Sequence, residues 1–197
     1  EILMGQKTNI LITTTSFPRW EGDLEGGGNF VLSLCKELQK QFNVSVLTPY
    51  VKGAATNNRI EGIDIYRYKF LFCRSGNLIN KSGIAETLSQ QKWKFLFVPF
   101  LLIAQLFAIK KICEKKQCKV INAHWLVPQG FIAGLYKKFF NKDIKIVSTS
   151  HGSDLNMSFG RIGNKLLQFI AKQTDRLTVV SNELKEKAKK VGFRNDI

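Results

Sequence analysis

The sequence predicts an α/β protein built on a doubly wound, mostly parallel sheet. Short apolar, β-branched runs alternate along the chain with longer segments of helical periodicity. Strands that are apolar on both faces and separated by helices are typical of parallel sheets covered on both sides. The 197 residues contain no internal repeat and no low-complexity linker, so we expect a single Rossmann-like domain over residues 1–197.

Six strands and five helices are expected along the chain. The strands are Ile10–Thr14, Val44–Thr48, the weaker alternating run Ile63–Tyr68, Val120–Ala123, Ile144–Thr149 and Leu177–Val180. The helices are Asn29–Gln41, Lys94–Lys116, Pro128–Phe140, Ile162–Lys172 and Glu183–Val191. In the first helix, Phe30, Leu34 and Leu38 form one of two apolar rows expected to pack on the sheet.

Composition excludes several classes of protein. Hydrophobic residues make up 44% of the chain and aromatic residues 11%, which is ample for a core and too much for a disordered basic tail. The chain has four cysteines, which form no C-x-x-C pair and no cluster with histidine: Cys35, Cys73, Cys113 and Cys118. This sparse use excludes a disulfide framework and suits a reducing compartment. We therefore expect a cytoplasmic protein.

The net charge of +15 arises beyond residue 50. Residues 1–50 carry 4 basic and 5 acidic side chains, so residues 51–197 hold 26 basic and 10 acidic ones, a net charge of +16. Such a surface attracts polyanions, anionic lipid headgroups or a phosphorylated ligand. For any single lysine cluster, a solvated face that keeps the protein soluble is the alternative interpretation.

The most apolar stretch is Phe95–Ile109. Its 15 residues would span ~22 Å as a helix, which is short of the ~30 Å hydrocarbon core of a bilayer. We expect a helix that covers the sheet rather than one that crosses a membrane. Insertion into a membrane surface is the alternative, because the flanking residues are those of an interfacial helix: Lys92, Trp93, Lys94, Lys110 and Lys111.

Candidate ligand-binding residues follow three of the expected strands. Ligands of open parallel sheets bind beyond the carboxyl ends of the strands, so the segments directly after each strand matter most. These segments hold Arg19 with Gly26, Gly27 and Gly28, then His124, Trp125 and Gln129, and finally His151 and Asp154. Both histidines of the chain are therefore expected on the same edge of the sheet.

The glycines and the histidines each have a chemical and a structural interpretation. Glycines before a helix let the backbone approach an anion, or simply form a turn. They match neither G-x-G-x-x-G nor a P-loop, and no acidic residue ends Val44–Thr48, which argues against a nicotinamide-dependent enzyme. A neutral His151 can bind a sugar hydroxyl or phosphate and relay a proton. Two histidines on separate loops, without carboxylates at matching spacing, predict no metal site.

Asp154 and Trp125 also remain open between two roles. The Asp154 carboxylate can hold a sugar hydroxyl, or it can cap the turn that follows it. The Trp125 indole can stack on a sugar face, or it can pack inside the protein. The convergence of these residues on one edge, rather than any one of them, predicts a binding site.

Four segments resemble one known family. The strings ILITTTSFPR…GGGNFVLSLCKEL…VSVLTP, INAHWLVPQGFIAGL, IVSTSHGSDL and DRLTVVSNELKEKA are similar to the N-terminal half of family 4 glycosyltransferases. These are retaining, nucleotide-sugar-dependent enzymes of the two-domain GT-B fold. The resemblance runs from about Asn9 to Gly192, and HWLVPQG and HGSDL are its most specific parts. It implies that this chain forms the acceptor-side half of such an enzyme.

The resemblance also implies roles for the residues at the sheet edge. Gly27 and Gly28 would lie against the donor diphosphate or the incoming acceptor. His151 and Asp154 would belong to the catalytic site, and the acceptor side would be lined by Arg19, His124, Trp125 and Gln129. The donor would be a nucleotide-diphosphate sugar and the acceptor a cell-envelope polysaccharide or a lipid-linked glycan. Neither a metal nor a nucleic acid partner is expected.

In this family a second, C-terminal domain makes most of the donor contacts, and it would lie outside this chain. We therefore expect the chain alone to have little or no transferase activity. The competing hypothesis is a non-catalytic basic α/β module that binds a polyanion or an anionic membrane surface. Either protein would be cytoplasmic, and peripheral attachment to the inner face of the cell membrane is left open.

Overall fold

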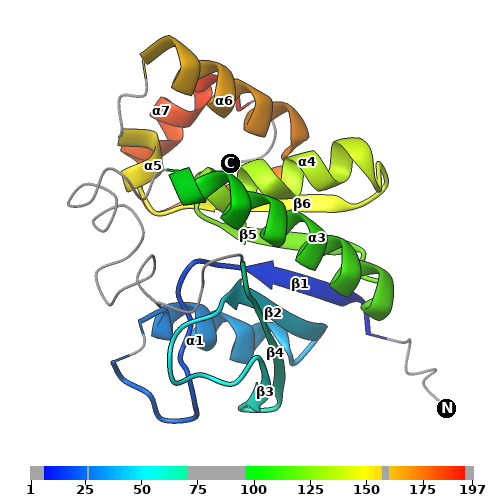
Figure 1. The fold of residues 1–197 in the computed structure, drawn as a ribbon. Coiled ribbons are helices and arrows are strands. Elements are labelled where there is room, and N and C mark those ends of the chain that lie inside the picture. Colours follow the sequence, from blue (N-terminus) through cyan, green and yellow to red (C-terminus); the bar gives the residue numbers. More distant parts are fainter. Residues whose placement is uncertain (1–6, 26, 71–95, 157–159, 194–197) are drawn as a thin grey trace, which may run out of the picture.

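The computed structural model describes residues 7–25, 27–70, 96–156 and 160–193. Seven strands form one sheet in the order β3-β4-β2-β1-β5-β6-β7 (Figure 1). They are β1 (Asn9–Thr13), β2 (Asn43–Pro49), β3 (Asn57–Ile60), β4 (Ile63–Tyr68), β5 (Val120–His124), β6 (Lys145–Ser150) and β7 (Arg176–Val179). Every neighbouring pair in this sheet is parallel except β3 and β4. The predicted fold class is confirmed.

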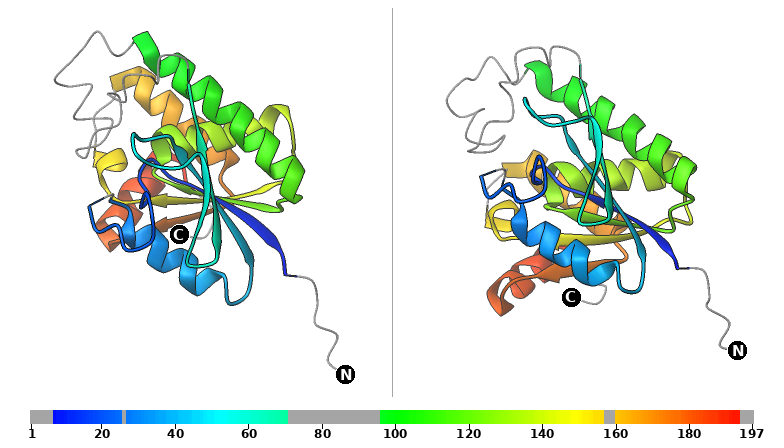
Figure 2. Two further views of the ribbon diagram at one scale, coloured as in Figure 1. Left: turned by 60° about the horizontal axis from the view of Figure 1, so that its bottom comes forward. Right: turned by 90° about the horizontal axis from the view of Figure 1, so that it is seen from below.

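Helices cover both faces of the sheet (Figure 2). On one face lie α3 (Val98–Lys116), α4 (Phe131–Phe139) and α6 (Gly160–Gln173), and on the other lie α1 (Asn29–Leu38) and α7 (Asn182–Val191). Two short turns, η3 (Leu126–Gly130) and α5 (Ser153–Asn156), follow β5 and β6. Buried side chains alternate accordingly along β1: Leu11 packs in the core with α3 and α4, whereas Ile10 and Ile12 pack in the core with α1.

The observed elements differ from the predicted ones in a few places. β3 is not predicted, because its sequence NNRI lacks apolar alternation. It forms through a tight turn at Glu61 and Gly62, both with positive φ, and pairs antiparallel with β4 at the edge of the sheet. The predicted helix Pro128–Phe140 is divided into η3 and α4. The first residues of the predicted helix Lys94–Lys116 lie outside the described residues.

The buried side of α3 includes one polar side chain. Gln105 is fully buried, in line with Leu101 and Ile109 on the inner side of the helix. Its Nε2 atom donates to Thr13 Oγ1 of β1 at 3.2 Å, and the Tyr68 hydroxyl donates to its Oε1 atom at 3.4 Å. The polar residue that interrupts the apolar stretch therefore faces the sheet, which turns other apolar residues of the helix outward.

Candidate functional site

The candidate site lies where the strand order reverses. β1 pairs with β2 on one side and with β5 on the other, and the chain reaches β2 through α1. The connections that leave the carboxyl ends of β1 and β5 therefore run to opposite sides of this point. Doubly wound sheets bind their ligands in the space between such connections. The first turn of α1 and the segments after β5 and β6 meet at this point.

Four rings form what we call the rim cluster: Phe30, His124, Trp125 and His151. The ring centroids of Phe30 and His151 are 4.9 Å apart, and so are those of Trp125 and His151. Phe30 meets Trp125 nearly edge-on at 6.0 Å. The structure thus brings together three of the predicted site residues. It adds Phe30, which the sequence pattern assigned to the face of α1 packed on the sheet and which is 49% exposed.

The two histidines form a stacked, hydrogen-bonded pair. Their ring planes differ by 18° with centroids 5.4 Å apart, and His124 Nδ1 lies 3.2 Å from His151 Nε2. One of these nitrogens carries the proton that the other accepts. His124 is only 2% exposed, whereas His151 is half-buried. His124 thus contacts the second histidine rather than the surface, and its predicted contact with an acceptor stays a prediction.

Both imidazoles favour the neutral state. Burial, and to a smaller degree repulsion from a charged His151, lowers the pKa of His124 to about 4. Burial also lowers the pKa of His151, against the attraction of the Asp154 carboxylate, which raises it. The pair is therefore uncharged at neutral pH, and it can offer a hydrogen bond without carrying a full charge.

Trp125 has an unusual backbone conformation, with φ 72° and ψ 138°. Bulky residues rarely adopt positive φ, and holding one there costs of order 1–3 kcal/mol. Two backbone hydrogen bonds fix it: Trp125 N–H donates to Thr149 O at 2.8 Å, and Gly130 N–H donates to Trp125 O at 3.1 Å. The neighbouring strand and η3 thus hold the indole against His151.

Asp154 ties the segment after β6 to the segment after β5. One carboxylate oxygen accepts the Leu126 N–H at 2.7 Å, and the other accepts the Ser150 hydroxyl at 2.5 Å and the Leu155 N–H at 3.1 Å. The residue is 3% exposed. These contacts make Asp154 a positioning residue for the loops that carry Trp125 and His151. Direct participation in catalysis stays a prediction.

Gly27 and Gly28 lie at the start of α1, and both have positive φ. A Cβ atom on Gly28 would lie 2.2 Å from the Ser16 carbonyl oxygen, and one on Gly27 would lie 2.6 Å from Ser16 Oγ. Glycine is therefore required because the helix start packs directly on the loop after β1. Gly28 gives α1 no side-chain cap, and the first turn of the helix holds no acidic residue. The partial positive charge of the helix N-terminus is therefore not offset by a side chain of that turn. Gly26 lies outside the described residues.

Arg19 and Gln129 have surroundings different from those of the rim cluster. The Arg19 guanidinium forms two hydrogen bonds to the buried Asp23 carboxylate, at 2.7 and 2.8 Å, and lies 4.2 Å from the Trp20 ring centroid. This pairing holds the pKa of Asp23 well below its usual range. Gln129 is fully buried, and its amide has no hydrogen-bond partner among the described residues. Acceptor binding by Arg19 and Gln129 stays a prediction.

Arg67 has no role in the sequence-based prediction, yet it supports the site. It lies near the end of β4, is 5% exposed, and donates to the Pro18 carbonyl at 2.6 Å and the Ala55 carbonyl at 3.0 Å. It thereby fixes the loop that leads from β1 to the glycines. A signal was present in the sequence: Arg67 continues the row of Ile63 and Ile65, whose side chains face the core.

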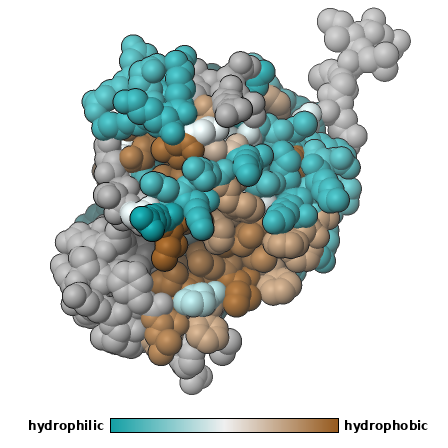
Figure 3. Space-filling view, turned by 90° about the horizontal axis from the view of Figure 1, so that it is seen from above, coloured by the Kyte–Doolittle hydropathy of each residue, from teal (hydrophilic) through white to brown (hydrophobic). Residues whose placement is uncertain are grey.

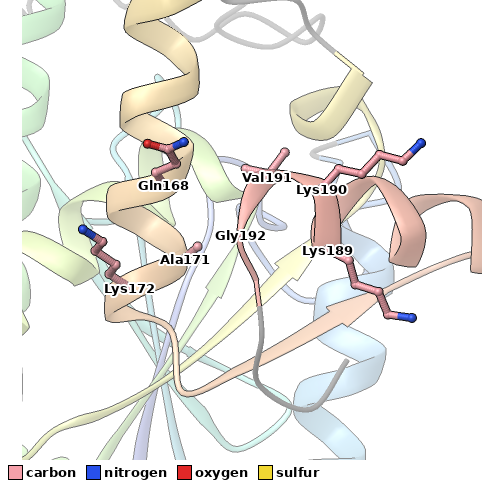
Figure 4. A pocket seen from close by; sticks show the side chains of 7 residues that line it. All are labelled: Gln168, Ala171, Lys172, Lys189, Lys190, Val191 and Gly192. Atoms are coloured by element: carbon pink, nitrogen blue, oxygen red, sulfur yellow. The ribbon is translucent and has the colours of Figure 1, made fainter.

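Two hollows lie away from the rim cluster. The larger, of about 570 Å³, lies between α6 and α7, and Lys172, Lys189 and Lys190 are among its lining residues. Figure 4 shows that these lysine side chains point away from one another. They do not converge on a common ligand position. Among the described residues, no group of three or more His, Cys, Asp or Glu side chains is placed to hold a metal ion. The absence of a metal requirement stays a prediction.

Comparison with known proteins assigns the chain to a family. The model for Glycosyltransferase Family 4 matches residues 24–197, which include the whole rim cluster. The chain belongs to glycosyltransferase family 4. It is similar to N-acetyl-alpha-D-glucosaminyl L-malate synthase of Bacillus anthracis, with 29% identity over 101 residues. That match covers 50% of this chain and 26% of the relative, about a quarter of its length. The seven-stranded family 4 domain is consistent with one half of a GT-B fold.

Proposed function

We propose that this family 4 domain is the acceptor-side half of a retaining glycosyltransferase. The enzyme would move a sugar from a nucleotide-diphosphate donor to a cell-envelope polysaccharide or a lipid-linked acceptor. The observation that carries the proposal is the hydrogen-bonded pair of His124 and His151 at the reversal of strand order, within the residues matched by the family. Most donor contacts would come from a second domain, so the chain alone would turn over little or no donor.

The reaction needs groups that stabilise negative charge on a departing diphosphate. Backbone N–H groups at a helix N-terminus do this when they are aimed at the position where charge develops. In this chain the start of α1, reached through Gly27 and Gly28, lies at the same edge as His151, because Phe30 of its first turn contacts that ring. The diphosphate would therefore approach the first turn of α1 beside the rim cluster.

The histidine pair would act as a neutral hydrogen-bond donor. Among the described residues, the buried His124 Nε2 atom has no hydrogen-bond partner. A buried N–H group without a partner is rarer in proteins than an acceptor without one. His124 therefore carries its proton on Nδ1 and donates it to His151 Nε2. His151 then carries its own proton on Nδ1, where it can donate to a sugar hydroxyl or a phosphate oxygen.

This tautomer also resists protonation of His151. A second proton on His151 would have to go on Nε2, which faces the N–H of His124. The pair could accept it only if His124 moved its proton to the buried Nε2 atom, where the described residues offer no acceptor. His151 would thus bind the substrate as a neutral imidazole over the physiological pH range.

Turnover by the natural full-length protein tests this function. Release of nucleoside diphosphate from a panel of nucleotide sugars, in the presence of envelope glycans and lipid extracts, identifies the donor. We expect His151→Ala to lower turnover roughly 10²-fold or more. His151→Asn keeps a polar side chain of similar size, so it is the variant to test if His151→Ala does not fold. Lys142→Ala changes an exposed residue on another loop and is the matched control. Full activity of both His151 variants would overturn the assigned role.

The competing function, a non-catalytic basic module, predicts a different result. The net charge of +15 favours this competing function, because a strongly basic surface attracts polyanions and such binding needs no chemical step. In that case the full-length protein would release no nucleoside diphosphate from any nucleotide sugar. It would retain polyanion binding in the His151→Ala variant, because the imidazole contributes little to the charge at neutral pH.

A further inference from the structure

Two cysteines meet at the carboxyl end of α3, although their spacing in the sequence matches no motif. Cys113 lies in the last turn of the helix, and Cys118 lies between the helix and β5. Both are free thiols in the same part of the core, 4% and 5% exposed. The Cys113 thiol donates a hydrogen bond to Cys118 Sγ, and the Tyr136 hydroxyl of α4 donates one to Cys113 Sγ. We call Cys113 and Cys118 the thiol pair.

The backbone at the end of α3 brings the thiol pair together. Gln117, directly after the helix, has a left-handed conformation with φ 53° and ψ 47°. Its N–H donates to the Cys113 carbonyl oxygen, and the Cys118 N–H donates to the same oxygen at 3.0 Å. A helix end of this kind folds the chain back, so that the residue after the left-handed one contacts the last turn of the helix. The contact between the two thiols is therefore set by local backbone geometry.

This geometry suits a disulfide. Disulfides join cysteines whose side chains point toward each other and whose Cα atoms lie ~4.4–6.8 Å apart. Two thiols that share a hydrogen bond already point toward each other, and rotation about their Cα–Cβ bonds brings the sulfur atoms closer. Cys35 has no such neighbour among the described residues, because it packs in the core on the other face of the sheet. Cys73 lies outside the described residues.

The two thiols differ in acidity. The hydrogen bond that Cys118 accepts from Cys113 lowers the pKa of Cys118; burial opposes this effect, and the positive charge of Lys116 adds to it. The same hydrogen bond and burial raise the pKa of Cys113. Cys118 is therefore the thiol that ionises first, and the thiolate is the form that reacts with oxidants.

Cys118 lies just below a hydrophilic part of the surface. Its neighbours Gln117 and Lys119 are exposed, and so are Glu114 and Lys115 of the last turn of α3. Figure 3 shows hydrophilic residues that border an apolar area on this side of the molecule. Among the described residues, no helix is both long and apolar enough to cross a membrane. Helix ends open locally more easily than helix centres, so a small oxidant in water can reach Cys118.

We propose that the thiol pair is a peroxide-sensitive site that closes reversibly to a disulfide. The Cys118 thiolate would attack one oxygen of hydrogen peroxide, the O–O bond would break, and the departing hydroxide would take up a proton as water. Cys113 Sγ would then attack the sulfenic acid on Cys118. The S–O bond would break, and the hydroxyl group would leave as water with the Cys113 proton. The two thiols lose two electrons and two protons in total, and one peroxide becomes two waters.

The disulfide would tie the end of α3 to the chain entering β5. This point lies at the amino ends of the parallel strands, opposite the edge that carries the rim cluster. Oxidation would therefore restrict local opening at this end of the helix and leave the contacts of the rim cluster in place. The proposal does not rest on the proposed function, because thiol oxidation requires no sugar transfer.

Peptide mapping of the 197-residue chain tests the proposal. The folded protein is treated with hydrogen peroxide, its remaining thiols are alkylated, and it is digested with trypsin. Trypsin cleaves after Lys115 and Lys116, which lie between the two cysteines, so only a disulfide keeps their peptides together. We expect a linked peptide with Cys113 and Cys118, lighter by two hydrogen atoms than its two parts and separated by dithiothreitol. Recovery of both cysteines as alkylated thiols, or as sulfinic acids without a link, would overturn the proposal.

Matched variants show whether the folded structure pairs these two thiols. Cys118→Ser and Cys113→Ser should each abolish the linked peptide. Cys35→Ala and Cys73→Ser should leave it, and the second of these stays informative if the change at the buried Cys35 prevents folding. A link that forms only in urea, or one that joins Cys35 or Cys73 in place of either partner, would overturn the assignment.

Thermal unfolding measures whether the folded positions suit the bond. The oxidised chain should have a Tm higher by about 5 °C than the reduced chain, because the disulfide restricts a short loop of the unfolded state. Cys118→Ser treated with the same peroxide is the control for oxidation elsewhere, and its Tm should not rise. A lower Tm in the oxidised chain than in the treated control would mean that the bond distorts the end of α3, and it would overturn the geometric argument.

Discussion

Two regions gather aromatic side chains at helices of the same sheet, but their surroundings are reversed. One is the rim cluster, and the other is a row of exposed apolar residues on and just before α3, which we call the α3 stripe: Leu96, Phe100, Ile103 and Phe107. In the rim cluster, two imidazoles lie among aromatic rings, with His124 only 2% exposed and His151 half-buried. In the α3 stripe, aromatic rings are exposed beside lysines, and Phe107 is 57% exposed. Buried polar groups and exposed apolar groups are the two departures from ordinary burial that carry information about function.

The two regions also differ in how they are held together. The rim cluster depends on contacts between segments far apart in the sequence, such as Asp154 with Leu126 and Phe30 with His151. The α3 stripe depends only on the rotation of one helix, whose opposite side buries Leu101, Gln105 and Ile109. Substitutions at the rim should therefore change stability and ionisation, whereas substitutions in the stripe should leave both nearly unchanged.

The largest effect is expected at the glycine before α1. In Gly28→Ala the new Cβ atom would lie 2.2 Å from the Ser16 carbonyl oxygen, at a φ of 71°. We expect a loss of unfolding free energy of ~3 kcal/mol or more, measured by urea denaturation. Gly22→Ala is the control, because Gly22 has a φ of 80° with nothing near its Cβ position. It should cost only ~1 kcal/mol. Similar losses in both variants would contradict the close approach.

A somewhat smaller loss is expected when the carboxylate that joins the two loops is removed. Asp154→Ala leaves the Leu126 N–H and the Ser150 hydroxyl without their acceptor, and both residues are fully buried. The unfolding free energy should fall by ~2–3 kcal/mol. Asp154→Asn keeps one acceptor oxygen and should lose less. If both variants are as stable as the natural protein, the carboxylate does not position the rim cluster.

The buried imidazole predicts a dependence of stability on pH. The pKa of His124 is about 4 in the folded protein, below its value near 6.5 in the unfolded chain, so the unfolded chain binds more protons in this range. Its contribution to stability is thus complete above pH ~6.5 and is lost as the pH falls toward 4.

Urea denaturation at two pH values measures this contribution. Between pH 7 and pH 5 the unfolding free energy should fall by ~2 kcal/mol on account of His124. In His124→Phe, which keeps a ring but cannot titrate, this part of the pH dependence should disappear. An unchanged pH dependence in the variant would mean that His124 is not held neutral.

The smallest effect is expected in the α3 stripe. Phe107→Ser should change the unfolding free energy by less than ~0.5 kcal/mol, because the ring is largely exposed in the folded protein. Leu101→Ser on the same helix is the control, since Leu101 is 1% exposed and should cost several times more. A large loss in Phe107→Ser would show that the ring is covered by the protein itself, and it would remove the contrast between the two regions.

The order and type of the elements could be predicted from the sequence alone, for a local reason. β-branched apolar runs and helical periodicity are set by neighbouring residues, so β1, β2, β4 to β7 and the long helices were all indicated. The edge strand β3 was not, because its polar sequence forms a strand only by pairing with β4. The placement of both histidines at one edge also followed from the sequence, since the carboxyl ends of parallel strands meet there.

Only the tertiary structure decided how those residues are used. The sequence could not show that Phe30 turns away from the sheet onto His151, that Arg67 supports the loop after β1, or that Gln105 faces inward. Each depends on contacts between residues distant in the chain and on the rotation of a helix about its axis. Periodicity defines an apolar face, but burial and hydrogen bonds with other segments decide which side chains of that face are covered and which remain exposed.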